Sequence, residues 1–173
     1  VGGLSSGPGL DQGVTQGPLI DQAAVEKTEA FIADARAKGG AVVCGGRRHS
    51  LGGNFFEPTV ISGANQSMDF AQEEIFGPVA PVFRFQTEEE AVALANAVPY
   101  GLAAYAYTRD LGRAVRLSEA LEYGMVGVNE SMISTCEAPF GGVKESGLGR
   151  EGSRHGMEDY TVIKYVCLGG LGA

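Results

Sequence analysis

The chain has 173 residues, of which 44% are hydrophobic and 20% charged, and its formal net charge at pH 7 is −8. This length fits one domain with a sizeable core, and the composition is ordinary for a globular protein. The acidic balance argues against nucleic acid as a partner, because phosphate binding needs clustered Lys and Arg. No apolar run approaches the roughly 18 residues of a membrane-spanning helix, so we expect no membrane insertion.

Three cysteines and two histidines are too few and too scattered for a disulfide framework or a metal site. The N-terminus lacks the basic-then-apolar order of a secretory signal. We therefore expect a cytoplasmic protein without a bound metal.

The first half of the chain predicts one helix and three strands. Asp21 can cap a helix that runs to about Lys38 and ends at Gly39-Gly40. Its expected apolar face consists of Val25, Thr28, Phe31, Ile32 and Ala35. The predicted strands are Ala41–Cys44, Phe55–Ile61 and Val79–Phe85. Pro81 inside the third of them indicates an edge strand or a bulge.

The second half predicts further helices and strands. Thr87 and Glu90 form a capping box that opens a helix to about Val98. Asp110 can cap another helix, which Gly124 ends. Its expected inward residues are Ala114, Val115, Leu117 and Leu121. The remaining predicted elements are strands at Leu102–Tyr107, Met125–Val128 and Val162–Cys167 and a short helix around Arg150–Asp159.

The alternation of helices and strands predicts an α/β fold with a mostly parallel sheet and flanking helices. Ligands of such sheets bind beyond the carboxyl ends of the strands, which places residues 129–134 at a site edge. The last predicted strand, Val162–Cys167, has no obvious neighbour within the chain. We expect it to pair with another subunit, in a homo-oligomer.

The stretch from Gln72 to Val79 sets a carboxylate and an aromatic ring two residues apart, ahead of a Gly-Pro turn. Glu74 could accept the hydroxyls of a ribose, and Phe76 could offer an apolar surface to a flat ring. The stretch therefore indicates a nucleotide-cofactor site. The structural alternative is a turn anchored by a buried Phe76. No GxGxxG follows a predicted strand, so the chain shows no dinucleotide-binding fold of its own.

A glycine-rich stretch from Asn129 to Gly147 is the second candidate. Its paired glycines, Gly141-Gly142, allow close approach to a ligand or a neighbouring strand, and Phe140 can wall an apolar pocket. A surface loop is the alternative. Cys136 has no basic neighbour in sequence to lower its pKa, so we interpret it as a bystander thiol. We interpret His155 as a surface residue rather than a general base.

Four motifs in this order resemble the C-terminal part of aldehyde dehydrogenases, over a match from about Asp11 to Gly170. They are Gln16–Ile20, Glu73–Pro78, Tyr100–Leu102 and Pro139–Gly142. Four more stretches look like succinate-semialdehyde dehydrogenase, with glutarate-semialdehyde dehydrogenase as the runner-up: Asn54–Thr59, Gly124–Glu130, Ser146–Gly152 and Lys164–Gly170. The resemblance implies a partial catalytic domain over residues 1–160, followed by an oligomerisation strand and tail over residues 161–173. Val1–Leu10 departs from the family pattern.

The resemblance also implies site residues. Glu74 matches the glutamate that holds the nicotinamide ribose, Phe76 matches the aromatic that packs near that ring, and Pro78 shapes the same loop. Ser134 matches the serine that hydrogen-bonds the distal carboxylate of succinic semialdehyde. Phe140 matches an aromatic that lines the aldehyde pocket. The implied cofactor is NAD or NADP.

Family chemistry needs a cysteine thiolate that attacks the aldehyde, hydride transfer to NAD(P)⁺, and a glutamate base for thioester hydrolysis. The resemblance places that cysteine, that base and the dinucleotide domain upstream of this segment, and Cys44, Cys136 and Cys167 do not match the nucleophile's motif. We expect the parent protein to oxidise succinic semialdehyde to succinate. The isolated chain should be inactive and should bind cofactor weakly. The alternatives are a fragment of another aldehyde dehydrogenase or a non-enzymatic assembly module.

Overall fold

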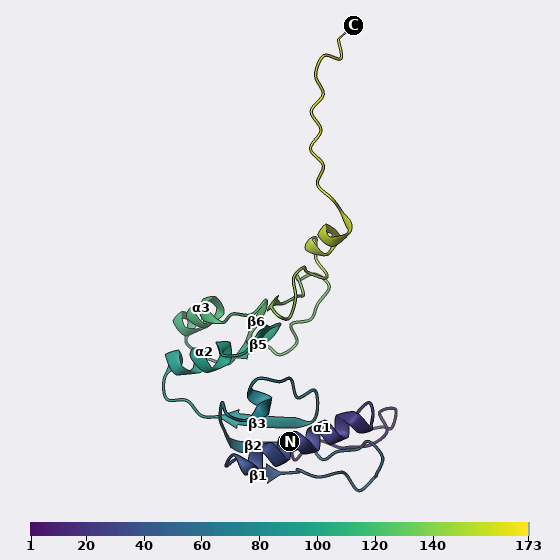
Figure 1. Cartoon of the computed structure of the whole chain (residues 1–173), viewed down its shortest axis with the longest axis vertical. Coiled ribbons are helices and arrows are strands. Elements are labelled where there is room, and N and C mark those ends of the chain that lie inside the picture. The colour runs from purple at the N-terminus through teal and green to yellow at the C-terminus, as the bar shows by residue number, and fades with distance from the viewer. Residues whose placement is uncertain (173) are drawn as a thin grey trace. The chain divides into compact units, whose positions relative to one another are not determined.

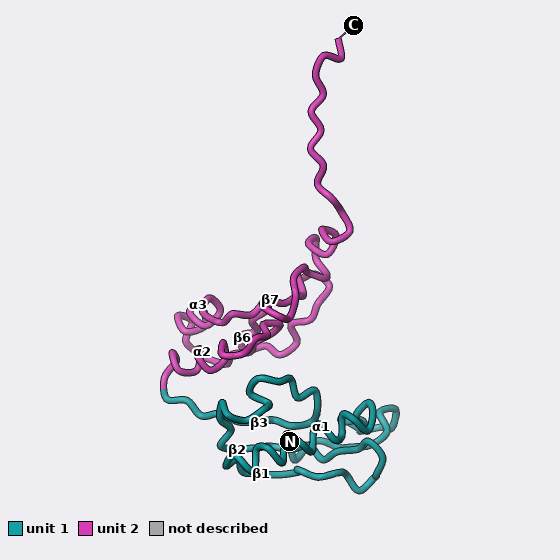
Figure 2. Tube along the Cα trace, in the orientation of Figure 1, with its two compact units in different colours: residues 1–86 teal, residues 87–173 magenta. Residues whose placement is uncertain are grey.

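The computed structural model describes residues 1–172 and divides the chain into two compact units, Val1–Gln86 and Thr87–Ala173 (Figure 2). Unit 1 contains α1 (Gln22–Ala37), β1 (Ala41–Cys44), β2 (Thr59–Ala64), the 3-10 helix η1 (Asp69–Ala71) and β3 (Val79–Phe83). Unit 2 contains α2 (Glu88–Asn96), β4 (Tyr100–Gly101), β5 (Ala103–Ala106), α3 (Leu111–Ala120), β6 (Met125–Val128), β7 (Val143–Lys144) and the 3-10 helix η2 (His155–Tyr160) (Figure 1). None of the helices in this described part is long and apolar enough to cross a bilayer.

Helix α1 forms where the sequence predicts it. The Asp21 carboxylate accepts a hydrogen bond from the Ala24 amide at 2.8 Å, which satisfies one of the unpaired donors at the helix start. The predicted apolar face is the buried face: Val25, Thr28, Phe31, Ile32 and Ala35. Gly39 follows the last turn with a φ of +90°. This left-handed conformation ends the helix and is most easily adopted by glycine.

The sheet of unit 1 has the strand order β1-β2-β3. Strand β2 pairs antiparallel with β1 and parallel with β3, so β3 with Pro81 lies at the sheet edge, as predicted. Strand β2 begins at Thr59 rather than at Phe55, because Pro58 has no amide to donate to a ladder. Phe56 instead forms an isolated bridge with Arg48 and is 1% exposed.

The apolar core of the described residues lies in unit 1. Helix α1 contacts β1 and η1, and its Val25 and Phe31 belong to one buried cluster with Ile61 of β2. The buried apolar residues are Val25, Phe31, Ile32, Ala35, Phe56, Ile61, Ala64, Met68, Phe70, Ala71 and Val79. Within residues 87–172 of the described chain, no apolar side chain reaches the same degree of burial. Unit 2 is therefore held together without a closed core of its own.

Unit 2 contains two small sheets. Strands β5 and β6 pair in parallel, from Ala103 opposite Met125 to Ala106 opposite Val128, and β4 pairs antiparallel with β7. Two of the four strand pairs of residues 1–172 are thus parallel. The predicted α/β class is confirmed.

Both helices of unit 2 begin at their predicted caps and end earlier than predicted. The Thr87 hydroxyl accepts from the Glu90 amide at 3.1 Å, and the Asp110 carboxylate accepts from the Arg113 amide at 2.6 Å. Helix α2 ends at Asn96 because Pro99 disfavours a helical residue before it. Helix α3 ends at Ala120, whose carbonyl accepts a hydrogen bond from the side-chain nitrogen of Asn96 at 2.8 Å.

Glu88 joins the two helices through ion pairs. Its carboxylate lies 2.8 Å from Arg113 Nε and 2.7 Å from Arg116 Nε. Hydrogen bonds from Arg116 and then Arg113 lower the pKa of Glu88 from 4.5 to about 2.

The prediction of a last strand at Val162–Cys167 is not met within the chain. The structure assigns no regular element after Tyr160 up to residue 172, and Figure 1 shows this segment as an extended tail. A strand needs a partner for its backbone groups, and no strand of the described residues supplies one. Val162 and Ile163 are 92% and 101% exposed.

The Glu88 ion pairs predict a pH dependence of stability that a single substitution removes. A carboxyl group whose pKa is lowered on folding stabilises the fold above its unfolded pKa, and this contribution disappears as pH falls through the folded pKa. The difference in thermal midpoint between wild type and Glu88→Gln should be constant above about pH 5 and vanish towards pH 2. Circular dichroism melts across this range measure it. Glu119→Gln, at an exposed position of α3 outside these ion pairs, is the control for the loss of one negative charge. A Glu88→Gln difference that is the same at every pH would contradict the prediction.

Candidate functional site

The loop of residues 72–78 is fixed at both ends to the core of unit 1. The amides of Gln72 and Glu73 donate to the Asp69 carbonyl of η1 at 3.1 and 3.0 Å. At the other end, the Pro78 carbonyl accepts from the Thr59 amide of β2 at 2.8 Å. The Pro78 carbonyl therefore anchors this end of the loop, and its role at a cofactor stays a prediction.

Between these anchors, Ile75 points inward and its two neighbours point outward. Ile75 is packed against the core cluster, whereas Glu74 and Phe76 are exposed. Phe76 is 81% exposed and has a φ of +47°, a left-handed conformation that is strained for a bulky residue. The structural alternative, a turn anchored by a buried Phe76, is therefore wrong. Phe76 thus presents a large exposed ring from a strained backbone, and its contact with a cofactor stays a prediction.

The two adjacent carboxylates of the loop differ in their partners. Glu73 forms an ion pair with Lys27 of α1 at 2.8 Å, and the Lys27 amino group lies 5.3 Å from the centre of the Phe31 ring. Glu74 takes part in no ion pair among the described residues. Of the two carboxylates, Glu74 is thus the one available to a ligand.

The second candidate stretch begins at the carboxyl end of β6 with a clamp, the pair of hydrogen bonds between the Asn129 side chain and the Thr108 backbone. Asn129 has a φ of +56°, and its side-chain oxygen accepts from the Thr108 amide at 2.8 Å while its side-chain nitrogen donates to the Thr108 carbonyl at 2.7 Å. The Asn129 amide donates to the Ala106 carbonyl at 2.8 Å. Asn129 therefore fixes the start of the following loop to the end of β5.

Ser134 and Phe140 lie on the loop that follows this clamp. Ser134 is exposed, and Phe140 is half-buried. Phe140 forms an isolated bridge with Glu151, with backbone hydrogen bonds of 2.8 and 2.7 Å. The structure thus holds the backbone of Phe140 against a neighbouring segment, and contacts of Ser134 and Phe140 with a substrate stay predictions.

The paired glycines of this stretch pack against neighbouring backbone. A Cβ at Gly141 would lie 2.5 Å from the Gly149 carbonyl oxygen, and a Cβ at Gly124 would lie 2.0 Å from the Gly141 carbonyl oxygen. Any side chain at these positions would collide with backbone. Of the two roles expected for the glycines, the structure supports close approach to neighbouring chain.

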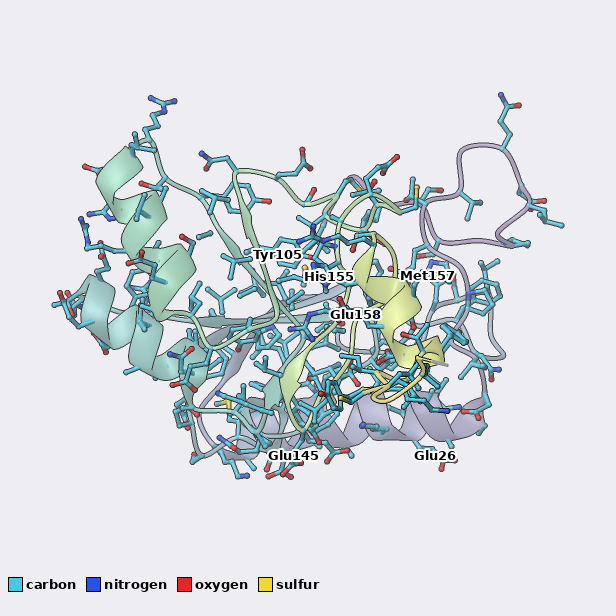
Figure 3. All side chains as sticks on the ribbon, turned by 90° about the horizontal axis from the view of Figure 1, so that it is seen from above. Glu26, Tyr105, Glu145, His155, Met157 and Glu158 are labelled. Atoms are coloured by element: carbon cyan, nitrogen blue, oxygen red, sulfur yellow. The ribbon has the colours of Figure 1, made fainter. Side chains whose placement is uncertain are left out.

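Cys136 and His155 are placed as the sequence interpretation expects. Cys136 is exposed, and its thiol, after the Thr135 hydroxyl and the Glu137 amide, is one of the groups whose hydrogen bonds lower the pKa of Glu137. This arrangement stabilises the Glu137 carboxylate. His155 Nδ1 lies 2.8 Å from the carboxylate of Glu158, and both belong to η2 on the surface (Figure 3).

The candidate residues are divided between the two units. Glu74, Phe76 and Pro78 belong to unit 1, and Ser134 and Phe140 belong to unit 2. Among residues 1–172, no three His, Cys, Asp or Glu side chains are grouped so that they could hold a metal ion.

Comparison with known proteins decides the family. The sequence model described as "Aldehyde dehydrogenase family" matches residues 1–166. The chain belongs to the aldehyde dehydrogenase family. The match includes Val1–Leu10, which the motifs alone did not assign to the family.

Individual aldehyde dehydrogenases are similar to nearly the whole chain. It is 61% identical over 169 residues to a 3-sulfolactaldehyde dehydrogenase of Pseudomonas putida, which covers 98% of the chain and 35% of that protein. It is 58% identical over 168 residues to the mitochondrial succinate-semialdehyde dehydrogenase of Arabidopsis thaliana, which covers 97% of the chain and 32% of that protein. The crystal structure of succinate-semialdehyde dehydrogenase from Burkholderia pseudomallei matches with a TM-score of 0.94 and 60% identity, over 96% of this chain and 35% of that one. The chain thus spans about a third of the length of these relatives.

Two features of the candidate site were not predicted from the sequence. The sequence placed Asn129 at a site edge but did not predict its clamp on Thr108, although an Asn directly after a strand is a frequent left-handed residue. The left-handed backbone of Phe76 had no local signal, because a bulky residue rarely adopts it.

The strain at Phe76 predicts an unusual effect of substitution. Phe76→Gly should leave the free energy of unfolding unchanged or raise it by up to about 1 kcal/mol, because glycine adopts a left-handed backbone without strain. Phe85→Gly is the matched control, since Phe85 is also exposed, at 58%, but has no positive φ. It should lower stability by about 0.5–1 kcal/mol. Urea unfolding followed by circular dichroism measures both, and a larger loss for Phe76→Gly than for Phe85→Gly would contradict the assignment of strain.

Proposed function

We propose that the chain is the C-terminal portion of a succinate-semialdehyde dehydrogenase, which oxidises succinic semialdehyde to succinate with NAD⁺ or NADP⁺. The observation that carries the proposal is the 60% identity, over 96% of the chain, to the Burkholderia pseudomallei enzyme of that name. We also propose that residues 1–160 are a portion of the catalytic domain and that residues 161–173 are an assembly strand and tail. A cytoplasmic location also stays a prediction, supported by three unpaired, exposed cysteines.

The loop of residues 72–78 fits one part of a nicotinamide dinucleotide. The Glu74 carboxylate is exposed and outside the ion pairs of the described residues, so it can accept hydrogen bonds from a ribose diol. The exposed Phe76 ring can lie against the adjoining ring, and Pro78 fixes the loop through its carbonyl. The dinucleotide, when bound, accepts hydride from the substrate. The residues of this chain only hold and orient it.

Ser134 and Phe140 are proposed to receive the substrate. A hydroxyl such as that of Ser134 can donate a hydrogen bond to an anionic oxygen at the far end of the aldehyde. Phe140 offers an apolar wall to the methylene groups between. The 61% identity to a 3-sulfolactaldehyde dehydrogenase favours a second candidate, an aldehyde whose terminal anion is a sulfonate. Glutarate semialdehyde, one methylene longer, is the remaining alternative.

The isolated chain is proposed to be inactive. The nucleophilic cysteine and the glutamate base that the resemblance implies lie outside it, and Cys136 does not match the nucleophile's motif. Two contacts from Glu74 and Phe76 cannot offset the cost of ordering a dinucleotide, so cofactor binding to the chain alone should be weak.

The proposed substrate class predicts a strong preference of the complete protein for an aldehyde with a terminal anion. The kcat/KM for succinic semialdehyde should exceed that for butanal, which has the same length but no charge, by at least about 100-fold, because butanal leaves the anion-binding groups unpaired. NAD(P)H formation measures it, with 3-sulfolactaldehyde and glutarate semialdehyde in parallel. A higher kcat/KM for the sulfonate would select the second candidate, and equal values for butanal would overturn the anionic class. The 173-residue chain, purified free of longer protein, should give no NAD(P)H.

The tail is proposed to join subunits. Its side chains are exposed along the whole predicted strand: Val162 by 92%, Ile163 by 101%, Tyr165 by 87% and Val166 by 62%. Such a run of apolar residues with unpaired backbone groups is a template for strand pairing. A second copy of the chain is the proposed partner.

Removal of the tail tests this assembly. Deletion of residues 162–173 from the complete protein should convert an oligomer into smaller species, as measured by size-exclusion chromatography with light scattering. Deletion of residues 168–173 alone is the control, since it spares the predicted strand, and it should leave the mass unchanged. An unaltered mass after the longer deletion would contradict the proposal that the tail pairs with a second copy.

A further inference from the structure

We propose that Asn129 is a positioning residue that sets the Ser134 hydroxyl for the terminal anion of the substrate. This inference rests on the proposed function, because it assigns the means by which one of its substrate-binding residues is held. Asn129 itself touches no substrate in this proposal. It acts through the backbone of the loop between them.

The first step is the fixation of the loop's origin. Three hydrogen bonds of 2.7 to 2.8 Å join Asn129 to the backbone of Ala106 and Thr108, two of them from its side chain. These bonds continue the parallel β5–β6 ladder for one position beyond Val128. The direction in which the chain leaves the sheet is therefore set by the Asn129 side chain.

The second step carries this fixation to Ser134. Ile133 folds back over β6 and lies close to Gly127. A Cβ atom at Gly127 would lie 2.9 Å from Ile133 Cγ2 and 2.5 Å from the Glu130 carbonyl oxygen. On the other side of Ser134, the Cys136 carbonyl accepts from the Ser153 amide at 2.8 Å. Ser134 thus lies between two contacts that hold the loop, one to β6 and one to the Ser153 amide, and Asn129 fixes the point from which this loop starts.

The third step is why asparagine is needed. The φ of +56° at position 129 favours Gly, Asn or Asp. Of these, only Asn can both accept from the Thr108 amide and donate to the Thr108 carbonyl. Asn129→Gly keeps the backbone conformation and loses both bonds. Asn129→Asp keeps the acceptor and places a carboxylate oxygen against a carbonyl oxygen.

The experiment compares substrates in the complete protein. Asn129→Gly should raise KM for succinic semialdehyde about 10-fold, as loss of one or two hydrogen bonds allows, and change KM for butanal less than about twofold. Asn129→Asp should raise the first KM at least as much. In both variants the ratio of KM for butanal to KM for succinic semialdehyde should therefore fall, because the change lies at the end of the site that receives the anion.

A matched control separates positioning from general stability. Asn96 makes the same two-bond bridge elsewhere in unit 2, to the Ala120 carbonyl at 2.8 Å and from the Glu122 amide at 2.9 Å. Asn96→Gly should lower the thermal midpoint about as much as Asn129→Gly and leave both KM values unchanged. Equal KM effects from Asn96→Gly would show that Asn129 is only structural.

A double-substitution cycle decides the proposal. Ser134→Ala alone should raise KM for the semialdehyde, and Asn129→Gly should add less than about twofold in the Ser134→Ala background, because both changes remove one interaction. Full additivity overturns the Asn129 proposal and leaves the proposed function standing. A Ser134→Ala variant with unaltered preference for the semialdehyde over butanal overturns the substrate-binding role of Ser134, and the Asn129 proposal with it.

Discussion

Burial of one face of α1 against the β1–β2–β3 sheet is the constraint on which the rest of the structure depends. Val25, Phe31 and Ile61 are 0–4% exposed and belong to a core cluster whose buried members all lie within residues 25–79. Burial of each such side chain stabilises a fold by about 1.5–3 kcal/mol. Unit 2 has no equivalent cluster among the described residues and is joined by hydrogen bonds and ion pairs. The chain spans about a third of the length of its relatives.

This difference explains how the two candidate stretches are held. The loop of residues 72–78 rests on the core through Ile75, which leaves Glu74 and Phe76 rigidly exposed on either side. The strain at Phe76 can persist because the packed core over-determines its surroundings. The loop after β6 has no such support and relies on the polar clamp of Asn129. Directional hydrogen bonds can fix a loop where burial cannot, but each contributes only about 0.5–1.5 kcal/mol.

Local chemistry in the sequence was enough to predict much of the fold. The caps at Asp21, Thr87 and Asp110 and the buried face of α1 follow from side chains that act within one or two helical turns. The end of α3 could not be predicted, because it depends on Asn96, 24 residues away in the chain. The site residues came from motif resemblance, whereas the left-handed backbone of Phe76 and the bond pair of Asn129 depend on tertiary packing.

Hydrogen exchange of the purified 173-residue chain tests most directly whether unit 1 is more stable against unfolding than unit 2. Amides of α1 and β2 should exchange slowly, at the rate set by global unfolding of unit 1, because they flank the closed core. Amides of β5, β6 and α3 should exchange much faster, since their ladder is covered by no buried apolar cluster. Equal protection of β2 and β6 would contradict this account and would mean that unit 2 is a stable domain by itself.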